Sequence, residues 1–508
     1  MKSVLFVLSV LLSTVLSAQV TITGALKNQS NKVLYAYANL DELSGKRVHL
    51  GTANLDDQGK FKMLCDIQQT TRVFLVIDQL EGMLFAEPER TYELNYFPSL
   101  EEASIVKFDR SPVEITFVHL PKNDLNEVIP KFNNDLYAFL EEHFYDFAVD
   151  TYTGSEAVKK IQSNNGKSDL FRKDPTAQDS VKVVKSEKGF VDWVGNFEKE
   201  MQTKYAEAAA NAYFNDYMRY SIAELKMMAG MNRKQLYTEY FMSQSVQITH
   251  PAYMKFFSAY YDHILERKSI QFQDKVMRIV NAERDPHKLY DLLKQDSLYM
   301  SEFVGELVVL KGLKDLYANT QYSKSSIILT MENLIRMPTM RLYKDIAQRI
   351  VDHLTKCTTG WELENFTLLD IQREKWVWNE QEPRYTYFFF YADWSSASKK
   401  EMLMMQKWFE TYGKDVRFVA ISMDDHMDKM INYAQKNRDF KFEFLYGGAD
   451  PLLREKFNLR SIPHAVLVDM DGKIMYDYTR KPSEGLNLDL DKITALLRKP
   501  KGGNTWKD

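Results

Sequence analysis

The segment that begins at Arg384 and ends at Gly413 constrains the fold of this chain more than any other. It opens with RYTYFFFYA, an almost continuous apolar run of the kind found in strands that are buried on both faces. The following SASKKEMLMMQKWFETYG has the character of a helix, with Gly413 as its closing residue. The segment therefore predicts a buried strand that leads directly into a helix.

The same alternation of strand and helix continues to about residue 500. DVRFVAIS predicts a second buried strand, and helices are expected at 427–437 and 451–457. HAVLVD and KIMYDY predict two strands joined by a hairpin turn at Met470-Asp471-Gly472. We therefore expect an α/β domain over residues 358–500, followed by a frayed tail at 501–508.

The preceding part of the chain divides into a β-rich region and a helical region. Residues 19–119 contain alternating runs such as VTITG and KVLYAYANL, and a turn cluster at Asp56-Asp57-Gln58-Gly59. Residues 120–357 change to helical periodicity, and Pro251 and Pro286 mark two helix starts. The expected fold class is multidomain α+β, with a β-sandwich, a central all-α region and a C-terminal α/β domain. Four helix faces carry this prediction: Phe132/Leu136/Leu140, Phe214/Met218/Ile222/Leu225, Phe303/Leu307/Leu310/Leu313 and Leu342/Ile346/Ile350/Leu354.

The first residues, MKSVLFVLSVLLSTVLSAQV, have the pattern of a secretory signal peptide over 1–18. Lys2 supplies the positive charge, a short apolar core follows, and Ala18 is a small residue at the expected cleavage point. No later stretch is apolar for long enough to cross a bilayer, so the mature chain is not expected to span a membrane. These features predict export to the periplasm or cell envelope.

Charge and cysteine content exclude several classes of function. The chain carries 66 basic and 70 acidic residues, a net charge of −4, which gives no footprint for nucleic acid. Its two cysteines, Cys65 and Cys357, form neither a CxxC pair nor a metal knuckle. Both are expected to be buried and free, although a long-range bridge between them stays open. No histidine pair, P-loop or dinucleotide motif is present, so neither a metal nor a cofactor is expected.

Three segments of the C-terminal region resemble the thioredoxin fold of exported thiol–disulfide oxidoreductases and their peroxide-reductase-like relatives. They are YADWSSASKKEM, VRFVAISMDDHMDKM and LREKFNLRSIPHAVLVDMDGKI. The N-terminal region, with GTANLDDQGKFKM and FAEPERTYEL, loosely resembles the small β-domain that precedes such modules. The resemblance implies that Pro463 follows Ile462 in a cis peptide bond.

The resemblance also places Ser395 and Ser398 where the family carries the two sulfurs of its CxxC motif. Thiol–disulfide exchange needs a thiolate nucleophile, and a serine hydroxyl cannot form the mixed disulfide. We therefore expect no dithiol activity at this position. Ser395 or Ser398 can instead cap the helix, and the Ser398–Glu401 spacing fits a capping box. A nucleophilic serine assisted by His464 is the sharper alternative, although no G-x-S-x-G elbow is present.

The leading hypothesis is a redox-inactive, exported binding or scaffold protein whose partner is an envelope protein or an extended peptide. Its expected recognition surface comprises Trp394, Ser395, Ser398, Ile462, Pro463 and His464. One alternative is an enzyme, which would be a thiol–disulfide oxidoreductase that uses thiols elsewhere or a Ser/His hydrolase. Another is an architectural protein in which the helical region binds the partner.

Overall fold

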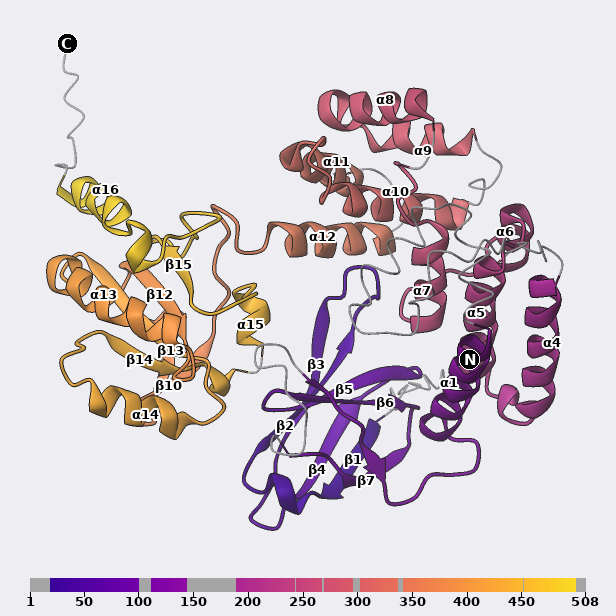
Figure 1. The fold of residues 1–508 in the computed structure, drawn as a ribbon, viewed down its shortest axis with the longest axis horizontal. Helices are drawn as coiled ribbons and strands as arrows, with labels where there is room; N and C mark the ends of the chain where they lie inside the picture. Colours follow the sequence, from indigo (N-terminus) through magenta and orange to yellow (C-terminus); the bar gives the residue numbers. More distant parts are fainter. Residues whose placement is uncertain are drawn as a thin grey trace, which may run out of the picture.

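The computed structural model describes residues 19–99, 111–143, 189–242, 244–266, 269–295, 302–336, 341–450 and 452–498. They form a β-rich N-terminal region, a central helical region and a C-terminal α/β region (Figure 1). This confirms the expected multidomain α+β class. No helix within these ranges is long and apolar enough to cross a bilayer. The predicted signal peptide, 1–18, and tail, 501–508, lie outside the described residues.

The N-terminal region is built from two sheets whose inner faces share one core. Val20 and Ile22 from one sheet and Leu75 and Leu84 from the other belong to the same buried cluster. Inward and outward residues alternate along the strands, most clearly in Lys60–Asp66. The first sheet has the order β4 (Lys60–Asp66), β1 (Gln19–Ala25), β7 (Thr91–Tyr96), β9 (Thr116–Phe117); the second has the order β3 (Arg47–Asn54), β2 (Val33–Asn39), β5 (Thr71–Ile77), β6 (Leu80–Ala86), β8 (Ser111–Pro112).

The turn predicted at Asp56–Gly59 links β3 to β4. Asp56 Oδ1 accepts the backbone N–H groups of Gln58 at 2.9 Å and Lys60 at 2.8 Å. Gly59 has a φ of +74°, and a Cβ atom there would lie 2.2 Å from the carbonyl oxygen of Leu26. Only glycine fits this close approach. Together with the hydrogen bonds that Asp56 accepts, this shows that residues Asp56–Gly59 form the predicted turn.

The helical region packs around two buried clusters, and the predicted helix faces supply much of both. Helices α7 and α9 start at the two predicted prolines, and His250 and Asp285 accept backbone N–H groups as their N-caps. The side chains of Phe303 and Leu342 lie outside the described set. The helices are α1 (Leu125–Glu142), α4 (Gly189–Lys204), α5 (Ala212–Met228), α6 (Arg233–Tyr240), α7 (Pro251–Tyr260), α8 (Ile270–Arg278), α9 (Pro286–Lys294), α10 (Glu302–Leu316), α11 (Lys324–Arg336) and α12 (Arg341–Thr355).

The loop between β2 and β3 joins the sandwich to the helices. Leu43 is part of the helical core, and Lys314 Nζ on α10 donates to its carbonyl oxygen at 2.6 Å. Asp41 has no exposed surface and accepts from Arg349 Nε of α12 at 2.7 Å. Asp41 also accepts hydrogen bonds from the backbone N–H and the hydroxyl of Ser44. The loop is therefore held both by bonds within itself and by bonds to α10 and α12.

The C-terminal region has a six-stranded sheet with helices on both faces. The middle strands β12 (Tyr385–Tyr391), β13 (Val416–Ser422) and β14 (Glu443–Tyr446) are parallel, and β15 (His464–Val468) runs antiparallel to β12. β10 (Thr367–Asp370) and β11 (Lys375–Val377) complete the order β11-β10-β14-β13-β12-β15.

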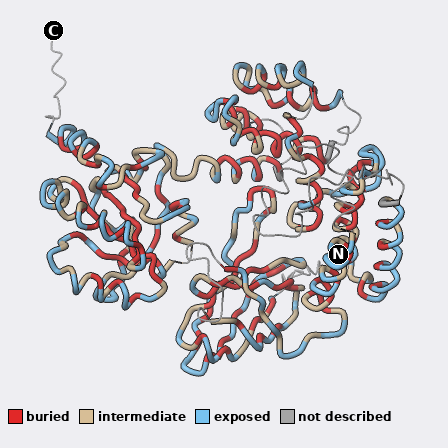
Figure 2. The backbone as a smooth tube through the Cα atoms, viewed as in Figure 1, coloured by how far each residue is buried: buried red, intermediate tan, exposed pale blue. Residues whose placement is uncertain are grey.

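Alternate residues of β12 enter two different cores, as a strand buried on both faces requires. Tyr387 and Phe389 pack with α13 (Ser396–Tyr412), α14 (Met427–Lys436) and α16 (Asn487–Arg498). Phe388 and Phe390 pack on the other face with Phe457 after the short α15 (Leu453–Lys456). Figure 2 shows the continuous buried stretch through this sheet, which confirms the prediction for the aromatic run.

The expected hairpin after β15 is only partly correct. The turn forms: Asp469 accepts backbone donors, and Gly472 has a φ of +79°. KIMYDY, however, is not a regular strand, and only an isolated bridge joins Ile474 to Val468. The segment is shared between two partners, because the N–H of Ile474 donates to Trp361 while Lys473 bridges to Glu362. The hairpin bonds are present on the other edge of the segment, where the N–H of Asp469 donates to Lys473 and the N–H of Met475 donates to Leu467.

The two cysteines are both free, so the long-range bridge that the sequence left open is not formed. Cys65 lies in the core of the sandwich, on β4. Cys357 follows α12 and packs at the edge of a core in the C-terminal region. The separate cores that hold them explain why they do not pair.

Candidate functional site at the carboxyl edge of the C-terminal sheet

The carboxyl ends of β12, β13 and β14 meet at one edge of the sheet, because the three strands are parallel. The loop after β12 is fixed there by Asp424, whose carboxylate accepts the backbone N–H of Asp393 at 2.9 and 3.1 Å. Ser422 Oγ also donates to Asp424, at 2.8 Å. Asp424 is only 2% exposed, and this burial raises the pKa of its carboxyl. Sequence reasoning missed this residue, since nothing in its neighbourhood signals the contact.

Ser395 is the N-cap of α13, whereas Ser398 is not a cap. The hydroxyl of Ser395 accepts the backbone N–H of Ser398 at 3.2 Å. Ser398 lies one turn inside the helix, fully buried, and its hydroxyl has no partner within the described part of the chain. Glu401 binds the backbone and hydroxyl of Ser483 instead of closing a capping box. The capping hypothesis is therefore correct for Ser395 and wrong for Ser398.

Trp394 is the exposed member of this edge. Trp394 is 46% exposed, whereas the last residues of β12, shortly before it in the chain, are buried. Asp393 and Lys399 form an ion pair of 2.9 Å across the first turn of α13, and both side chains are nearly half exposed. The site thus presents an aromatic ring and a charged pair to solvent.

Ile462 and Pro463 are joined by a cis peptide bond, as the resemblance implied. His464 opens β15 beside Phe390, and the two rings lie 6.2 Å apart. Burial, with a contribution from the charge of Lys481, lowers the pKa of the His464 imidazole. Pro463 and His464 line a cavity of about 130 Å³ that also contains Cys357.

Two of the six predicted site residues border the Cys357 cavity. They are Pro463 and His464, whereas Trp394, Ser395, Ser398 and Ile462 are absent from its lining. Among the described contacts, none joins Ser395 to His464, and the Ser395 hydroxyl is engaged with the backbone of its own helix. This geometry does not assemble a Ser–His pair, so the hydrolase alternative gains no support.

Both thiols are held in their protonated form. Burial raises the pKa of Cys357 to about 11, and the same cause raises that of Cys65 to about 11. Cys357 Sγ donates to the carbonyl oxygen of Lys456 at 3.0 Å. Since the thiolate is the reactive species, neither cysteine is activated at neutral pH.

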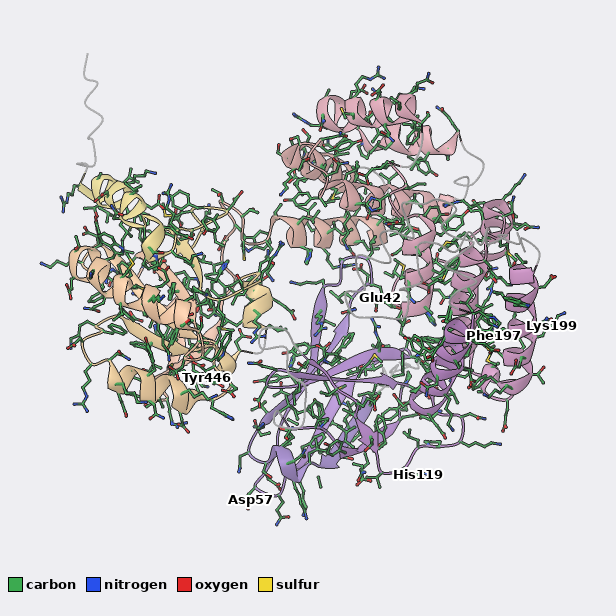
Figure 3. The ribbon with its side chains drawn as sticks, in the orientation of Figure 1. Glu42, Asp57, His119, Phe197, Lys199 and Tyr446 are labelled. Atoms are coloured by element: carbon green, nitrogen blue, oxygen red, sulfur yellow. The ribbon has the colours of Figure 1, made fainter. Side chains whose placement is uncertain are left out.

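The sandwich contributes residues to the same sheet edge. Asp78 and Gln79, in the turn between β5 and β6, border a small cavity with Asp424 and Gly447. Burial and the nearby charge of Asp78 raise the pKa of Tyr446, which Figure 3 places on the side of the C-terminal region nearest the sandwich. Leu452 also packs against the sandwich residues Tyr37, Phe74 and Val76. The edge therefore faces the N-terminal region, which the sequence did not predict.

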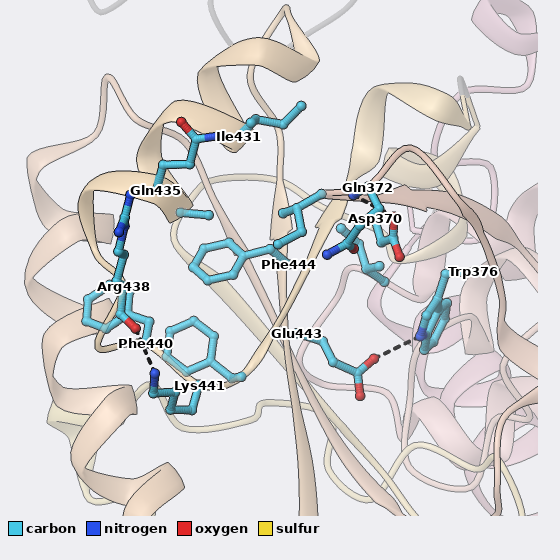
Figure 4. Close-up of a pocket in the computed structure, with 14 residues that line it drawn as sticks. Asp370, Gln372, Trp376, Ile431, Gln435, Arg438, Phe440, Lys441, Glu443 and Phe444 are labelled. Carbon is cyan, nitrogen blue, oxygen red and sulfur yellow. Dashed lines mark hydrogen bonds between the residues drawn. The ribbon is translucent and has the colours of Figure 1, made fainter.

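A third, larger cavity lies on another part of this region. It has a volume of about 640 Å³ and is bordered by Phe440, Phe444, Arg438 and Trp376 (Figure 4). Trp376 Nε1 donates to the Glu443 carboxylate at 2.8 Å. None of the predicted site residues borders it. Within the described ranges, no group of three or more His, Cys, Asp or Glu side chains is arranged to hold a metal ion.

Comparison with known proteins gives one family match. Residues 383–474 match the family model described as Thioredoxin-like. No curated protein is similar enough in sequence to count as a match.

Solved structures similar to this chain include two putative thiol-disulfide oxidoreductases from Bacteroides vulgatus. One is 22% identical, with a TM-score of 0.26, over 27% of this chain and 99% of its own. The other is 26% identical, with a TM-score of 0.25, over 27% and 90%. A putative thiol:disulfide interchange protein DsbE from Chlorobium tepidum is 16% identical, with a TM-score of 0.24, over 27% and 97%.

The family match begins just before β12, includes the Ser395 edge and the cis-proline loop, and ends just after the turn that follows β15. Strand order, the helix that follows β12 and the cis bond at Pro463 agree with it. The C-terminal region of this chain is accordingly a thioredoxin-like domain.

Proposed function

We propose that this chain is an exported, redox-inactive thioredoxin-fold protein that binds an extended segment of a protein in the bacterial cell envelope. The observation that carries the proposal is the state of Ser395 and Ser398. At the two positions that the family resemblance assigns to sulfur, one hydroxyl caps α13 and the other is fully buried inside it. This edge has the architecture of an exchange site without its nucleophile.

Loss of thiol chemistry follows from what exchange requires. A mixed disulfide forms only when a thiolate attacks a sulfur, and the start of α13 offers hydroxyls alone. Cys65 is buried in the sandwich, and Cys357 is protonated well above neutral pH. The thioredoxin-like domain would therefore act by presenting a binding surface and not by thiol chemistry.

A binding role fits what remains exposed at this edge. The Trp394 ring supplies apolar surface, and the loop around Ile462 and Pro463 supplies backbone groups that can pair with an extended chain. The signal-peptide pattern over 1–18 is the basis for proposing export, and it sets the cell envelope as the location of the partner.

Site-specific photo-crosslinking in intact cells tests the proposal. A photoreactive residue at Trp394 should capture a discrete partner, and Pro463→Ala should reduce that capture. The matched control is a photoreactive residue at Leu403, which is 59% exposed on α13, the helix that follows Trp394. Equal labelling from both positions, or no adduct from a folded protein, would remove binding from this edge and assign it to the helical region.

A second candidate function rests on the position of Cys357. Its thiol borders the same cavity as Pro463 and His464, so it is the cysteine from which thiol chemistry near the cis-proline loop could arise. Rapid alkylation of Cys357 in the native protein at neutral pH would favour this candidate. The raised pKa of the thiol argues for slow alkylation.

A further inference from the structure

The strand β14 is paired along its whole length on one side only. All four of its residues pair with β13, whereas β10 reaches only Leu445 and Tyr446. β10 ends at Asp370, where the chain turns back into β11. Within the described residues, Glu443 and Phe444 therefore have no strand partner on the β10 side. An extended backbone directs N–H and C=O groups to both sides, so this edge offers positions for a further strand.

The open edge lies in the cavity of about 640 Å³ (Figure 4). Figure 4 shows β14 between α14, which carries Ile431 and Gln435, and the turn that carries Gln372. The cavity has a volume within the range of roughly 300–1,000 Å³ that is typical of ligand pockets. Walls on both sides leave room for a single extended chain and hinder contact with the edge of another sheet.

Apolar side chains form much of the cavity lining. The rings of Phe440 and Phe442 stack with their centroids 5.1 Å apart, and those of Phe442 and Phe444 are 5.2 Å apart. Ile371, in the turn after β10, is 39% exposed and borders the same cavity. These residues offer contacts to the alternate side chains of a bound strand.

The two carboxylates in the lining are both engaged by the protein itself. Asp370 accepts two backbone N–H groups of the turn, each at 2.9 Å. Glu443 accepts from Trp376 Nε1 at 2.8 Å, and Arg417 Nε lies 3.4 Å from its other oxygen. These acids therefore stabilise the hairpin and the sheet.

The two cations in the lining are not neutralised in this way. Arg438 and Lys441 are exposed, and neither has an ion pair within 4.0 Å inside the described ranges. Lys441 Nζ donates to the backbone carbonyl oxygen of Arg438 at 3.0 Å, a contact that leaves both charges in place. The backbone N–H of Lys441 donates to Gln406 Oε1 of α13 at 3.1 Å, which fixes the segment. Figure 4 places both cations on the α14 side of the cavity.

We propose that this cavity binds an extended peptide segment that adds as a strand beside β14 and brings a carboxylate to Arg438 and Lys441. The segment supplies backbone partners for the β10 side of Glu443 and Phe444. Its carboxylate pairs with cations that the protein leaves without an acid, and arginine suits this contact through its paired donors. The inference goes beyond the proposed function, because none of the six residues of the predicted recognition surface borders this cavity.

The test uses fluorescein-labelled, C-terminally amidated hexapeptides with a core of alternating valine and threonine. One ends in two glutamates and a second in two glutamines. Two more have the glutamate sequence with methyl groups on alternate backbone nitrogens, in the two possible registers. Fluorescence anisotropy with the full chain should show the glutamate peptide binding roughly fivefold tighter than the glutamine peptide. A strand pairs through alternate N–H groups, so one methylated peptide should bind at least about tenfold more weakly than the other.

Substitutions in the lining test the charge contact. Arg438→Gln and Lys441→Gln should each weaken binding of the glutamate peptide by roughly threefold to fivefold and leave the glutamine peptide unchanged. Lys436→Gln is the matched control, since Lys436 is exposed at the end of α14 and absent from the lining. All three residues are on the surface, so the melting temperatures should equal that of the parent.

Hydrogen exchange tests the backbone contact independently of charge. Binding of the glutamate peptide should slow the exchange of amides in residues 442–445 and leave those of β2 in the sandwich unchanged. Binding without this protection would overturn strand addition, as would equal affinities of the two methylated peptides. Equal affinities of the glutamate and glutamine peptides, equal effects of Lys436→Gln and Arg438→Gln, or no binding by any peptide would overturn the inference as well.

The remaining outcomes identify other occupants and separate this site from the proposed function. A dimer in sedimentation that Arg438→Gln dissociates, with no peptide bound, would assign the edge to a second copy of the chain and overturn the peptide. A Trp394 crosslink that persists while no peptide binds would reject this site and keep the proposed function. Peptide binding without any Trp394 crosslink would do the reverse.

Discussion

Asp424 joins the ends of two parallel strands by accepting the backbone N–H of Asp393 at 2.9 Å from a position that is 2% exposed. The bond fixes the loop that carries Trp394 and leads into α13. Asp424→Ala would leave this N–H without its acceptor, and we expect a loss of about 1–3 kcal/mol in the free energy of unfolding. Urea denaturation, followed by fluorescence, measures it.

Asp424→Asn gives the matched test of charge. An asparagine oxygen can still accept the bond, but it carries no buried charge. Because the folded pKa of Asp424 is raised, the cost of ionising it appears as pH rises above its ordinary value of 3.8. The stability of the parent should therefore fall relative to Asp424→Asn from that pH upward. Parallel pH profiles for the two proteins would contradict this.

Ser395 stabilises α13 as its N-cap. Ser395→Ala should cost about 1 kcal/mol of unfolding free energy, since the N–H of Ser398 loses its acceptor. Ser396→Ala, in the first turn of the same helix and exposed, should cost much less. Equal losses would mean that the hydroxyl of Ser395 is not a cap.

Cys357 should react slowly despite its place beside the cis-proline loop. Its pKa of about 11 means that alkylation by iodoacetamide accelerates about tenfold per pH unit up to that value. Mass spectrometry of native and unfolded protein at neutral pH should find the native thiol far less modified. A rate already at its plateau at neutral pH would reveal an activated thiolate and favour the redox candidate.

The Asp41–Arg349 pair anchors the sandwich to the helices. Arg349→Met leaves a fully buried carboxylate without its cation, so opening of the 40–46 loop should become easier by about 3 kcal/mol. Hydrogen exchange of the loop amides measures this. Lys429→Met breaks a more exposed pair, with Asp425, and should change stability by less than about 1 kcal/mol. A similar, small effect of both substitutions would exclude the anchoring role.

Local patterns predicted the elements but not the contacts between them. The apolar run at 385–391 was sufficient for a buried strand, and the resemblance supplied the cis bond at Pro463. Pairing between Asp393 and Asp424, or entry of Leu43 into the helical core, depends on residues distant in sequence. The periodicity of apolar residues along the chain does not predict such contacts.

The prediction of one recognition surface stays a prediction. Pro463 and His464 border the Cys357 cavity, and β15 pairs His464 with Phe390 near the end of β12, the strand that leads to Trp394 and Ser395. KIMYDY had the composition of a strand, yet its ladder is limited to isolated bridges at Lys473 and Ile474, next to the hairpin bond from Met475 to Leu467. Local propensity therefore does not fix the length of a strand.

The most direct test of the central claim removes both cysteines of the chain. A Cys65→Ser/Cys357→Ser variant that carries a photoreactive residue at Trp394 should capture the same partner, in the same yield, as the protein with its thiols. A conservative Cys65→Ala/Cys357→Ala pair controls for the added hydroxyls. Capture that persists in either thiol-free protein would establish binding without redox chemistry. Loss of the partner from both, with their melting temperatures unchanged, would contradict the account and return the function to a thiol.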